Sequence, residues 1–80
     1  MDQKKVIAQF EAIRRLGQTN MFDRNMVERI AYENGFYEMV NAIEDDQIAF
    51  IFKHYSEWMK LVDDADIPEA RPVEATWRLR

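Results

Sequence analysis

The chain has 80 residues, of which 48% are hydrophobic and 32% charged, a balance that fits one small globular domain rather than a disordered segment. It has no cysteine, which excludes disulfides and thiolate metal sites. The formal net charge is −4, and residues 33–74 carry eleven acidic but only three basic side chains. Such an acidic part repels phosphate backbones, so nucleic acid is an unfavoured partner. No apolar run approaches the roughly 20 residues that cross a bilayer, and the first ten residues do not resemble a signal peptide.

The first predicted helix covers residues 3–16. Asp2 suits the N-cap position, because its carboxylate can accept hydrogen bonds from the free amides of the first turn. The apolar stripe of this helix comprises Val6, Phe10, Ile13 and Leu16. Gly17 follows two basic residues and is expected to end the helix in the left-handed conformation.

A second helix is predicted over residues 24–34. Asp23 is its expected N-cap, with Phe22 and Val27 placed to pack together as a hydrophobic staple. Its apolar face comprises Met26, Val27, Ile30 and Ala31. Gly35 is the expected left-handed residue after the helix, followed by Phe36 in a Schellman motif.

The third predicted helix begins near Phe36 and ends near Ile43. Its apolar residues are Phe36, Met39, Val40 and Ile43. The acidic residues 44–46 that follow could break the helix or form an exposed turn of a longer one, since no Gly or Pro interrupts them. We favour a break, in which Asp45 or Asp46 caps the next helix.

The fourth predicted helix is the longest and covers residues 47–62. Its main apolar seam comprises Ile48, Phe52, Tyr55, Met59 and Val62, at the spacing of two coiled-coil heptads. Phe50, Trp58 and Leu61 lie on another face. A helix that is apolar on more than one side is either central in the fold or has a second partner.

Residues 63–72 are acidic and contain both prolines, which predicts a linker or an ordered loop rather than a helix. Residues 73–80 alternate between apolar and polar side chains, the pattern of a half-buried strand. No other segment reads as a strand, so we interpret them as an extended arm anchored by Trp77. A frayed tail, pairing with a second copy and addition to a partner's sheet are the alternatives. The sequence thus divides into a helical domain, residues 1–62, and a linker with an arm, residues 63–80.

Three short motifs occur in the first half of the chain. They are Ile13-Arg14, Thr19-Asn20-Met21-Phe22-Asp23 and Gly35-Phe36-Tyr37-Glu38, followed by Val40 and Ile43. Together they resemble a small family of uncharacterised phage and prophage proteins, whereas the residues beyond Asp46 look like an extension. The resemblance implies a phage or prophage origin and a location in the host cytoplasm. It also implies a small protein that binds and inhibits a host protein, such as a defence protein, and it supplies no catalytic activity.

No combination of residues indicates catalysis or a bound cofactor. His54 is the only histidine, and we interpret it as a surface or edge residue of the fourth predicted helix. It lacks a nucleophile at a matching helical spacing, because Ser56 is only two residues away. The acidic residues at 63–66 lack the mid-loop glycine of a calcium site. Both glycines follow predicted helices, so neither belongs to a phosphate loop. We therefore predict a protein that is not an enzyme and that has no cofactor and no metal.

The second and third helices also resemble a helix-turn-helix motif in outline, with Ala31 and Gly35 four residues apart. The third helix would have to enter the major groove. Residues 36–46 contain no basic side chain and would bring acidic groups towards the phosphates. A small DNA-binding regulator is therefore retained only as an alternative.

The apolar side chains exceed what a core of this size can easily hide. The predicted partner-binding residues are Phe50, Trp58, Leu61 and Trp77, because exposed apolar patches and tryptophans are typical of interfaces. The fourth helix could instead use this face to cover the first three helices. A second predicted feature is an acidic face comprising Glu44, Asp45, Asp46, Asp63 and Asp64, which is either solvated surface or steers the protein towards a basic partner surface.

These observations predict an all-α fold of three short helices and one longer C-terminal helix, with an extended C-terminal arm. The expected function is that of a non-enzymatic interaction module that forms a homodimer through the fourth helix and binds an unidentified host protein. A nucleic-acid-binding host protein is one such partner. A structural or virion-associated oligomer is the remaining alternative.

Overall fold

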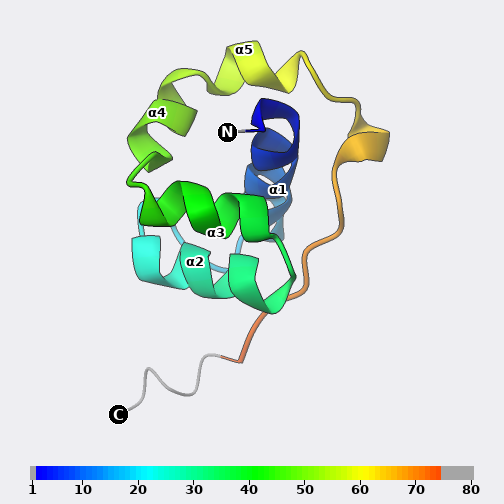
Figure 1. The fold of residues 1–80 in the computed structure, drawn as a ribbon. Helices are drawn as coiled ribbons and strands as arrows, with labels where there is room; N and C mark the ends of the chain where they lie inside the picture. The colour runs from blue at the N-terminus through cyan, green and yellow to red at the C-terminus, as the bar shows by residue number, and fades with distance from the viewer. Residues whose placement is uncertain (1, 75–80) are drawn as a thin grey trace.

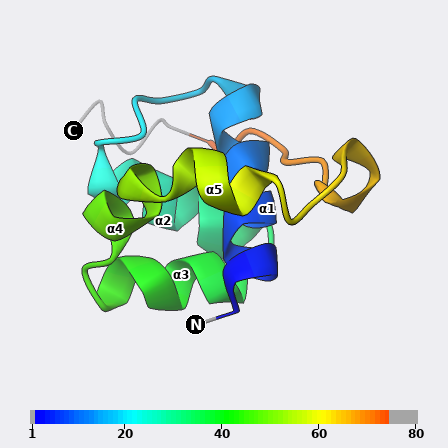
Figure 2. The same cartoon turned by 90° about the horizontal axis from the view of Figure 1, so that it is seen from above.

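A computed structural model describes residues 2–74 and contains only helices and loops over that range. Its elements are α1 (Gln3–Leu16), α2 (Arg24–Glu33), α3 (Tyr37–Glu44), α4 (Ile48–Lys53), α5 (Tyr55–Met59) and the short 3-10 helix η1 (Asp64–Asp66). Helices α2 and α3 form an antiparallel hairpin that packs against α1, and α5 lies across α1 (Figures 1 and 2). The all-α prediction is confirmed for the described residues. The predicted arm beyond Glu74, including Trp77, lies outside them.

Helix α1 begins and ends where its sequence predicts. The Asp2 carboxylate accepts a hydrogen bond from the backbone amide of Lys5 at 3.2 Å. Gly17 follows the last turn with φ of +68°, in the left-handed conformation that a residue without a Cβ adopts easily. The predicted stripe faces the core: Val6, Phe10 and Ile13 are buried, and Leu16 is partly buried.

The start of α2 agrees with the sequence in its cap but not in its staple. The Asp23 carboxylate accepts a hydrogen bond from the Met26 amide at 3.2 Å, as predicted. Val27 is fully buried, whereas Phe22 is 74% exposed and stacks on the ring of Phe52. The predicted pairing of Phe22 with Val27 is therefore replaced by a contact between the start of α2 and α4.

The end of α2 has the predicted Schellman motif. The Phe36 amide donates to the carbonyl of Ala31 at 2.8 Å, and the Gly35 amide donates to the carbonyl of Tyr32 at 3.1 Å. Gly35 has φ of +72°. These two hydrogen bonds satisfy carbonyls that the end of a helix leaves free.

Helix α3 is capped by a side chain of α1. Phe36, the residue before α3, makes no side-chain cap. Instead Gln9 Oε1 accepts a hydrogen bond from the Met39 amide at 2.9 Å, and Gln9 Nε2 donates to Glu38 Oε1 at 2.8 Å. One amide side chain thus fixes the first turn of α3 against α1.

The chain breaks between α3 and α4, as we favoured. The Asp46 amide donates to the Ile43 carbonyl and the Gln47 amide to the Ala42 carbonyl, both at 2.9 Å. This is a second Schellman motif, in which Asp46, with φ of +60°, takes the place usually held by glycine. The expectation that Asp45 or Asp46 caps the next helix is wrong, because α4 starts after Gln47, which makes no side-chain cap.

The prediction of one long helix over residues 47–62 is also wrong. The chain turns at His54 (φ −103°, ψ 10°), which separates α4 from α5 (Figure 1). The His54 amide donates to the carbonyls of Phe50 and Ile51 at 3.1 and 3.2 Å, and the His54 carbonyl accepts from the Trp58 amide at 2.8 Å. With this turn, Ile51 and Trp58 are both in the core, at 0% and 2% exposure.

The core includes large side chains from all five α-helices. Its fully buried large members include Phe10, Ile7, Ile13, Met26, Ile30, Met39, Ile43 and Ile51. The predicted coiled-coil seam packs against it, with Ile48, Phe52, Tyr55, Met59 and Val62 partly buried. The seam residues thus contribute part of their apolar surface to the core of the chain.

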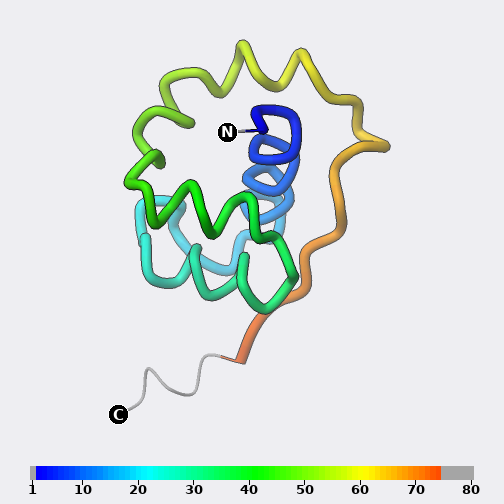
Figure 3. Tube along the Cα trace, viewed as in Figure 1, coloured from blue at the N-terminus to red at the C-terminus, as the bar shows by residue number. Residues whose placement is uncertain are grey.

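After α5 the chain returns along the helical body (Figure 3). Residues 63–72 form an ordered loop, one of the two predicted possibilities, and begin with η1. The segment from Ile67 to Glu74 has no helix or strand, and Ile67, Ala70 and Val73 pack against the core.

Candidate interaction surface

Three aromatic side chains from the loop before α2, from α4 and from α5 form an aromatic surface, which we define as Phe22, Phe52 and Tyr55. The rings of Phe22 and Phe52 are nearly parallel, at 9°, with centroids 4.5 Å apart. Phe52 meets the buried ring of Phe10 edge-on at 5.2 Å, and the Tyr55 ring lies 6.0 Å from that of Phe10. An exposed ring on a rigid aromatic base is suited to anchor another protein.

An open depression of about 470 Å³ lies beside this surface. It is lined by Phe10, Arg14, Phe52, Tyr55 and Ser56. The Arg14 guanidinium lies 5.8 Å from the centre of the Tyr55 ring, within the range of a cation–π contact. The depression thus places a cation beside aromatic rings, an arrangement suited to an aromatic or acidic side chain of a partner.

A buried carboxylate holds this edge of the surface in place. Glu11 is only 2% exposed, and its carboxylate accepts hydrogen bonds from Arg14 Nε at 2.7 Å, Arg14 Nη2 at 2.8 Å, Arg15 Nε at 2.8 Å and the Tyr55 hydroxyl at 2.7 Å. The hydrogen bonds from Arg14 are the largest reason that the pKa of Glu11 falls to about 2, against the opposing effect of burial. The ionised carboxylate therefore fixes Arg14 and the Tyr55 hydroxyl at neutral pH.

A second row of rings runs along α4 and α5. The ring centroids of Phe50 and His54 are 4.4 Å apart, and those of His54 and Trp58 are 5.6 Å apart. His54 Nδ1 lies 3.6 Å from Glu57 Oε2. In the part of the chain that the structure describes, no three His, Cys, Asp or Glu side chains gather where they could hold a metal ion.

The structure separates the predicted partner-binding residues. Phe50 and Leu61 are 43% and 45% exposed, so both remain available to a partner. Trp58 is 2% exposed, and the expectation that it stays on the surface is wrong, because the turn at His54 directs it into the core. Trp77 lies outside the described residues.

The predicted acidic face is also divided. Glu44, Asp45 and Asp46 are exposed at the turn between α3 and α4, whereas Asp63 and Asp64 are exposed at η1. Figures 1 and 2 both place that turn and η1 on opposite sides of the molecule, so the five residues do not form one face.

Several of these acidic side chains also have partners within the chain. Asp46 lies 3.3 Å from Arg24, and Asp64 lies 2.9 Å from Arg15. Asp63 forms a capping box with Asp66 at η1. Part of the predicted acidic surface therefore serves the fold.

The sequence pattern predicts neither the buried network around Glu11 nor the exposed position of Phe22. A signal for the network was present, because Arg14 and Arg15 follow Glu11 at i+3 and i+4, the spacing of helical ion pairs. Its link to Tyr55 joins residues 44 positions apart and had no signal in the sequence.

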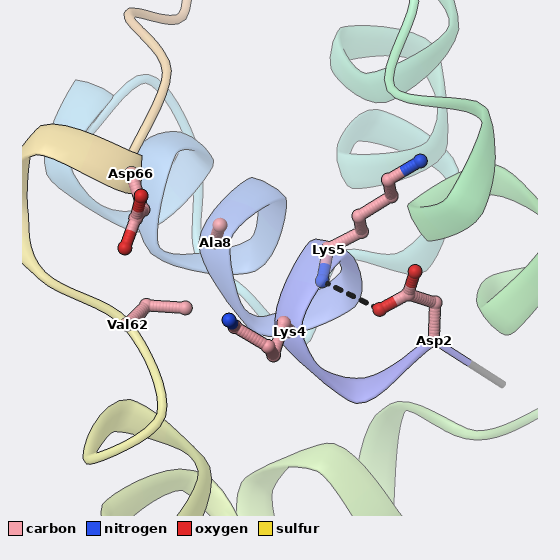
Figure 4. Close-up of a pocket in the computed structure, with 6 residues that line it drawn as sticks. All are labelled: Asp2, Lys4, Lys5, Ala8, Val62 and Asp66. Atoms are coloured by element: carbon pink, nitrogen blue, oxygen red, sulfur yellow. Dashed lines mark hydrogen bonds between the residues drawn. The ribbon is translucent and has the colours of Figure 1, made fainter.

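Another hollow, of about 320 Å³, lies between the start of α1 and η1 (Figure 4). Its lining residues are Asp2, Lys4, Lys5, Ala8, Val62 and Asp66. The Lys4 side chain points towards Val62 and Asp66, whereas the Lys5 side chain points away from them. The charged residues are exposed and balance in sign, so this hollow favours no class of ligand.

The model of a family described as "Domain of unknown function (DUF5049)" matches residues 1–59. No curated protein and no solved structure matches the chain. No helix within residues 2–74 has both the length and the apolar character needed to cross a membrane.

Proposed function

The chain belongs to the DUF5049 family, and from that premise we propose that it is a non-enzymatic protein-interaction module that binds its partner through the aromatic surface. The observation that carries this proposal is the position of Phe22, which is 74% exposed although its ring is held parallel to Phe52. A large apolar side chain that stays so exposed contributes little to its own fold, but it can bury much of its surface against a partner.

The resemblance of residues 10–43 to phage and prophage proteins supports a more specific form of the proposal. The protein would be phage-encoded, act in the host cytoplasm, and inhibit a host protein such as a defence protein. The acidic character of residues 33–74 favours a partner with a basic surface, because complementary charge speeds association and selects partners. A nucleic-acid-binding host protein meets that description.

A DNA-binding regulator is less well supported, although α2 and α3 form a tight helical hairpin. The exposed residues of α3 are Tyr37, Asn41 and Glu44. None of them is basic, so this helix offers no cation to the phosphates beside a major groove.

A homodimer, or a larger virion-associated oligomer, remains a proposal. A homodimer through the predicted fourth helix would use side chains left exposed on α4 and after α5, such as Phe50 and Leu61. Light scattering over a range of concentrations distinguishes a closed dimer, whose molar mass stays fixed, from an open assembly, whose molar mass grows.

The test of the proposed function is a quantitative pull-down from host lysate with two matched variants. Phe22→Ser removes the exposed ring of the aromatic surface. Tyr32→Ser removes a ring that is 63% exposed on α2 and is the control. We expect Phe22→Ser to lose a host protein that the unaltered chain and Tyr32→Ser both retain, with unchanged thermal unfolding. Equal capture by all three proteins would contradict the proposal.

A further inference from the structure

The segment from Ile67 to Glu74, which we call the strap, packs on the helical body in the way that a bound peptide packs on another protein. Its apolar residues Ile67, Ala70 and Val73 pack against the core at every third position. Two prolines, Pro68 and Pro72, lie between them. A repeat of three residues with prolines is typical of the polyproline II conformation, which peptide-binding domains recognise in their ligands.

Two side-chain amides of the helical body hold the backbone of the strap. The Arg71 amide donates to Asn34 Oδ1 at 2.8 Å, and Asn34 Nδ2 donates to the Arg71 carbonyl at 3.0 Å. The Val73 amide donates to Gln18 Oε1 at 2.9 Å, and Gln18 Nε2 donates to the Val73 carbonyl at 2.7 Å. A primary amide presents one acceptor and two donors, so each pair of bonds recognises an extended backbone whatever its side chain.

The charged side chains of the strap contribute no ion pair within the described residues. Glu69, Arg71 and Glu74 are exposed, and the ion pairs of residues 2–74 involve other side chains. Recognition therefore rests on backbone hydrogen bonds and on the spacing of apolar residues. A different peptide with the same spacing satisfies the same requirements.

The strap and the groove that it fills, formed by α1, the loop after it and the end of α2, come from different parts of the chain. Gln18 and Asn34 both lie within residues 1–59, the span that the family model matches, whereas the strap lies outside it. The strap does not fill the groove completely. An opening of about 440 Å³ is lined by Ala12, Arg15 and Leu16 of the helical body and by strap residues that include Ala70. A larger apolar side chain at the position of Ala70 would fill part of it.

We propose that this groove, formed by α1, the loop after it and the end of α2, binds an extended, proline-containing peptide of a partner protein, with apolar residues at every third position. The strap occupies the groove as an intramolecular competitor. Its attachment gives it a high effective concentration, on the order of millimolar for a short flexible connection. A partner peptide must therefore bind more tightly than the strap, and a larger residue at the position of Ala70 is one way to do so.

The test uses the full chain and a fluorescent synthetic peptide with the sequence of residues 67–74 carrying A70L. In the protein, Val73→Asp weakens the strap without altering the groove. We expect the peptide to bind Val73→Asp at least about ten-fold more tightly than the unaltered chain, measured by fluorescence anisotropy, because the competitor has been weakened. Adding Gln18→Ala and Asn34→Ala to Val73→Asp should remove the binding.

Further variants keep the outcome clear. Glu69→Gln changes an exposed strap residue and should bind the peptide as the unaltered chain does. If Val73→Asp proves unfolded by circular dichroism, Arg71→Pro replaces it, because this substitution at an exposed position removes the amide that donates to Asn34.

Two results would overturn the proposal. One is equal affinity of the peptide for the unaltered chain, for Val73→Asp and for the variant that also lacks both amides. The other is that the unaltered chain forms a dimer and that the peptide dissociates this dimer. In that case the groove would hold the strap of a second copy.

Discussion

Among single residues, Glu11 links the fold most directly to the proposed interaction surface. It is a carboxylate on the buried side of α1, and burial of an unpaired charge would be strongly unfavourable. Two arginines and the Tyr55 hydroxyl compensate for the lost hydration. The same hydrogen bonds restrain Arg14 and Tyr55, which line the depression beside Phe52. The buried carboxylate of Glu11 therefore also fixes the positions of two side chains at the surface.

Replacing Glu11 with Gln should make the protein less sensitive to acid. The pKa of Glu11 is lowered from its ordinary value of 4.5 to about 2 in the fold, so its contribution to stability is complete above pH 4.5 and is lost as the pH falls towards 2. We expect Glu11→Gln to lower the free energy of unfolding by roughly 3 kcal/mol at pH 7. The difference from the unaltered protein should shrink between pH 4.5 and pH 2.

Urea unfolding at a series of pH values measures this effect. Glu33→Gln is the control, because Glu33 is an exposed carboxylate at the end of α2. That variant should show the same loss of stability in acid as the unaltered chain. A constant difference between Glu11→Gln and the unaltered chain at every pH would mean that the charge of Glu11 does not stabilise the fold.

Asp46 gives a second prediction at the level of one residue. Its φ of +60° costs a residue with a Cβ about 1 kcal/mol relative to glycine. Its ion pair with Arg24 is exposed, has a distance of 3.3 Å, and contributes less than about 1 kcal/mol. We therefore expect Asp46→Gly to stabilise the protein by about 0.5 kcal/mol, seen as a higher urea midpoint. Asp45→Gly, where φ is −84°, should destabilise it; stabilisation by both substitutions would refute the explanation.

At the scale of the helices, the sequence predicts those features that are decided locally. The caps at Asp2 and Asp23 and the glycines at 17 and 35 lie next to the helix ends that they define, and α1 has the predicted bounds. The turn at His54 has no such signal, since neither Gly nor Pro is present. The residues that it places in the core, Ile51 and Trp58, belong to the packing of the whole chain.

The cap that Gln9 provides for α3 is likewise invisible in a local pattern, and it gives a prediction for this element. Gln9→Ala should destabilise the protein by about 1 kcal/mol, because the Met39 amide loses its acceptor. Faster hydrogen exchange of the Met39 amide should accompany the loss. Gln3→Ala, at the exposed start of α1, is the control and should leave that exchange rate unchanged. Equal exchange in both variants would show that Gln9 does not cap α3.

For the whole molecule, the expected excess of apolar side chains over the core is present in residues 2–74, but Phe22 belongs to it and the predicted Trp58 does not. The core takes in Trp58 and Ile51 and part of the surface of the predicted seam. The large apolar side chains left exposed in residues 2–74 are Phe22, Tyr32, Tyr37, Phe50 and Leu61. Which of these apolar side chains are buried depends on how α4 and α5 bend around α1. Helical periodicity assumes one straight helix and cannot describe this bend.

Trp58→Ala and Phe50→Ala distinguish a core residue from a surface residue. Trp58 is 2% exposed, so its removal should lower the free energy of unfolding by about 3–5 kcal/mol, a large part of the stability of a small domain. Phe50 is 43% exposed, and its replacement should cost less than about 2 kcal/mol. Thermal unfolding measures the first effect, and light scattering shows whether either variant changes molar mass. A Trp58→Ala protein that keeps its melting temperature and only dissociates would place this tryptophan between two chains, and the single-chain core described above would then be incorrect.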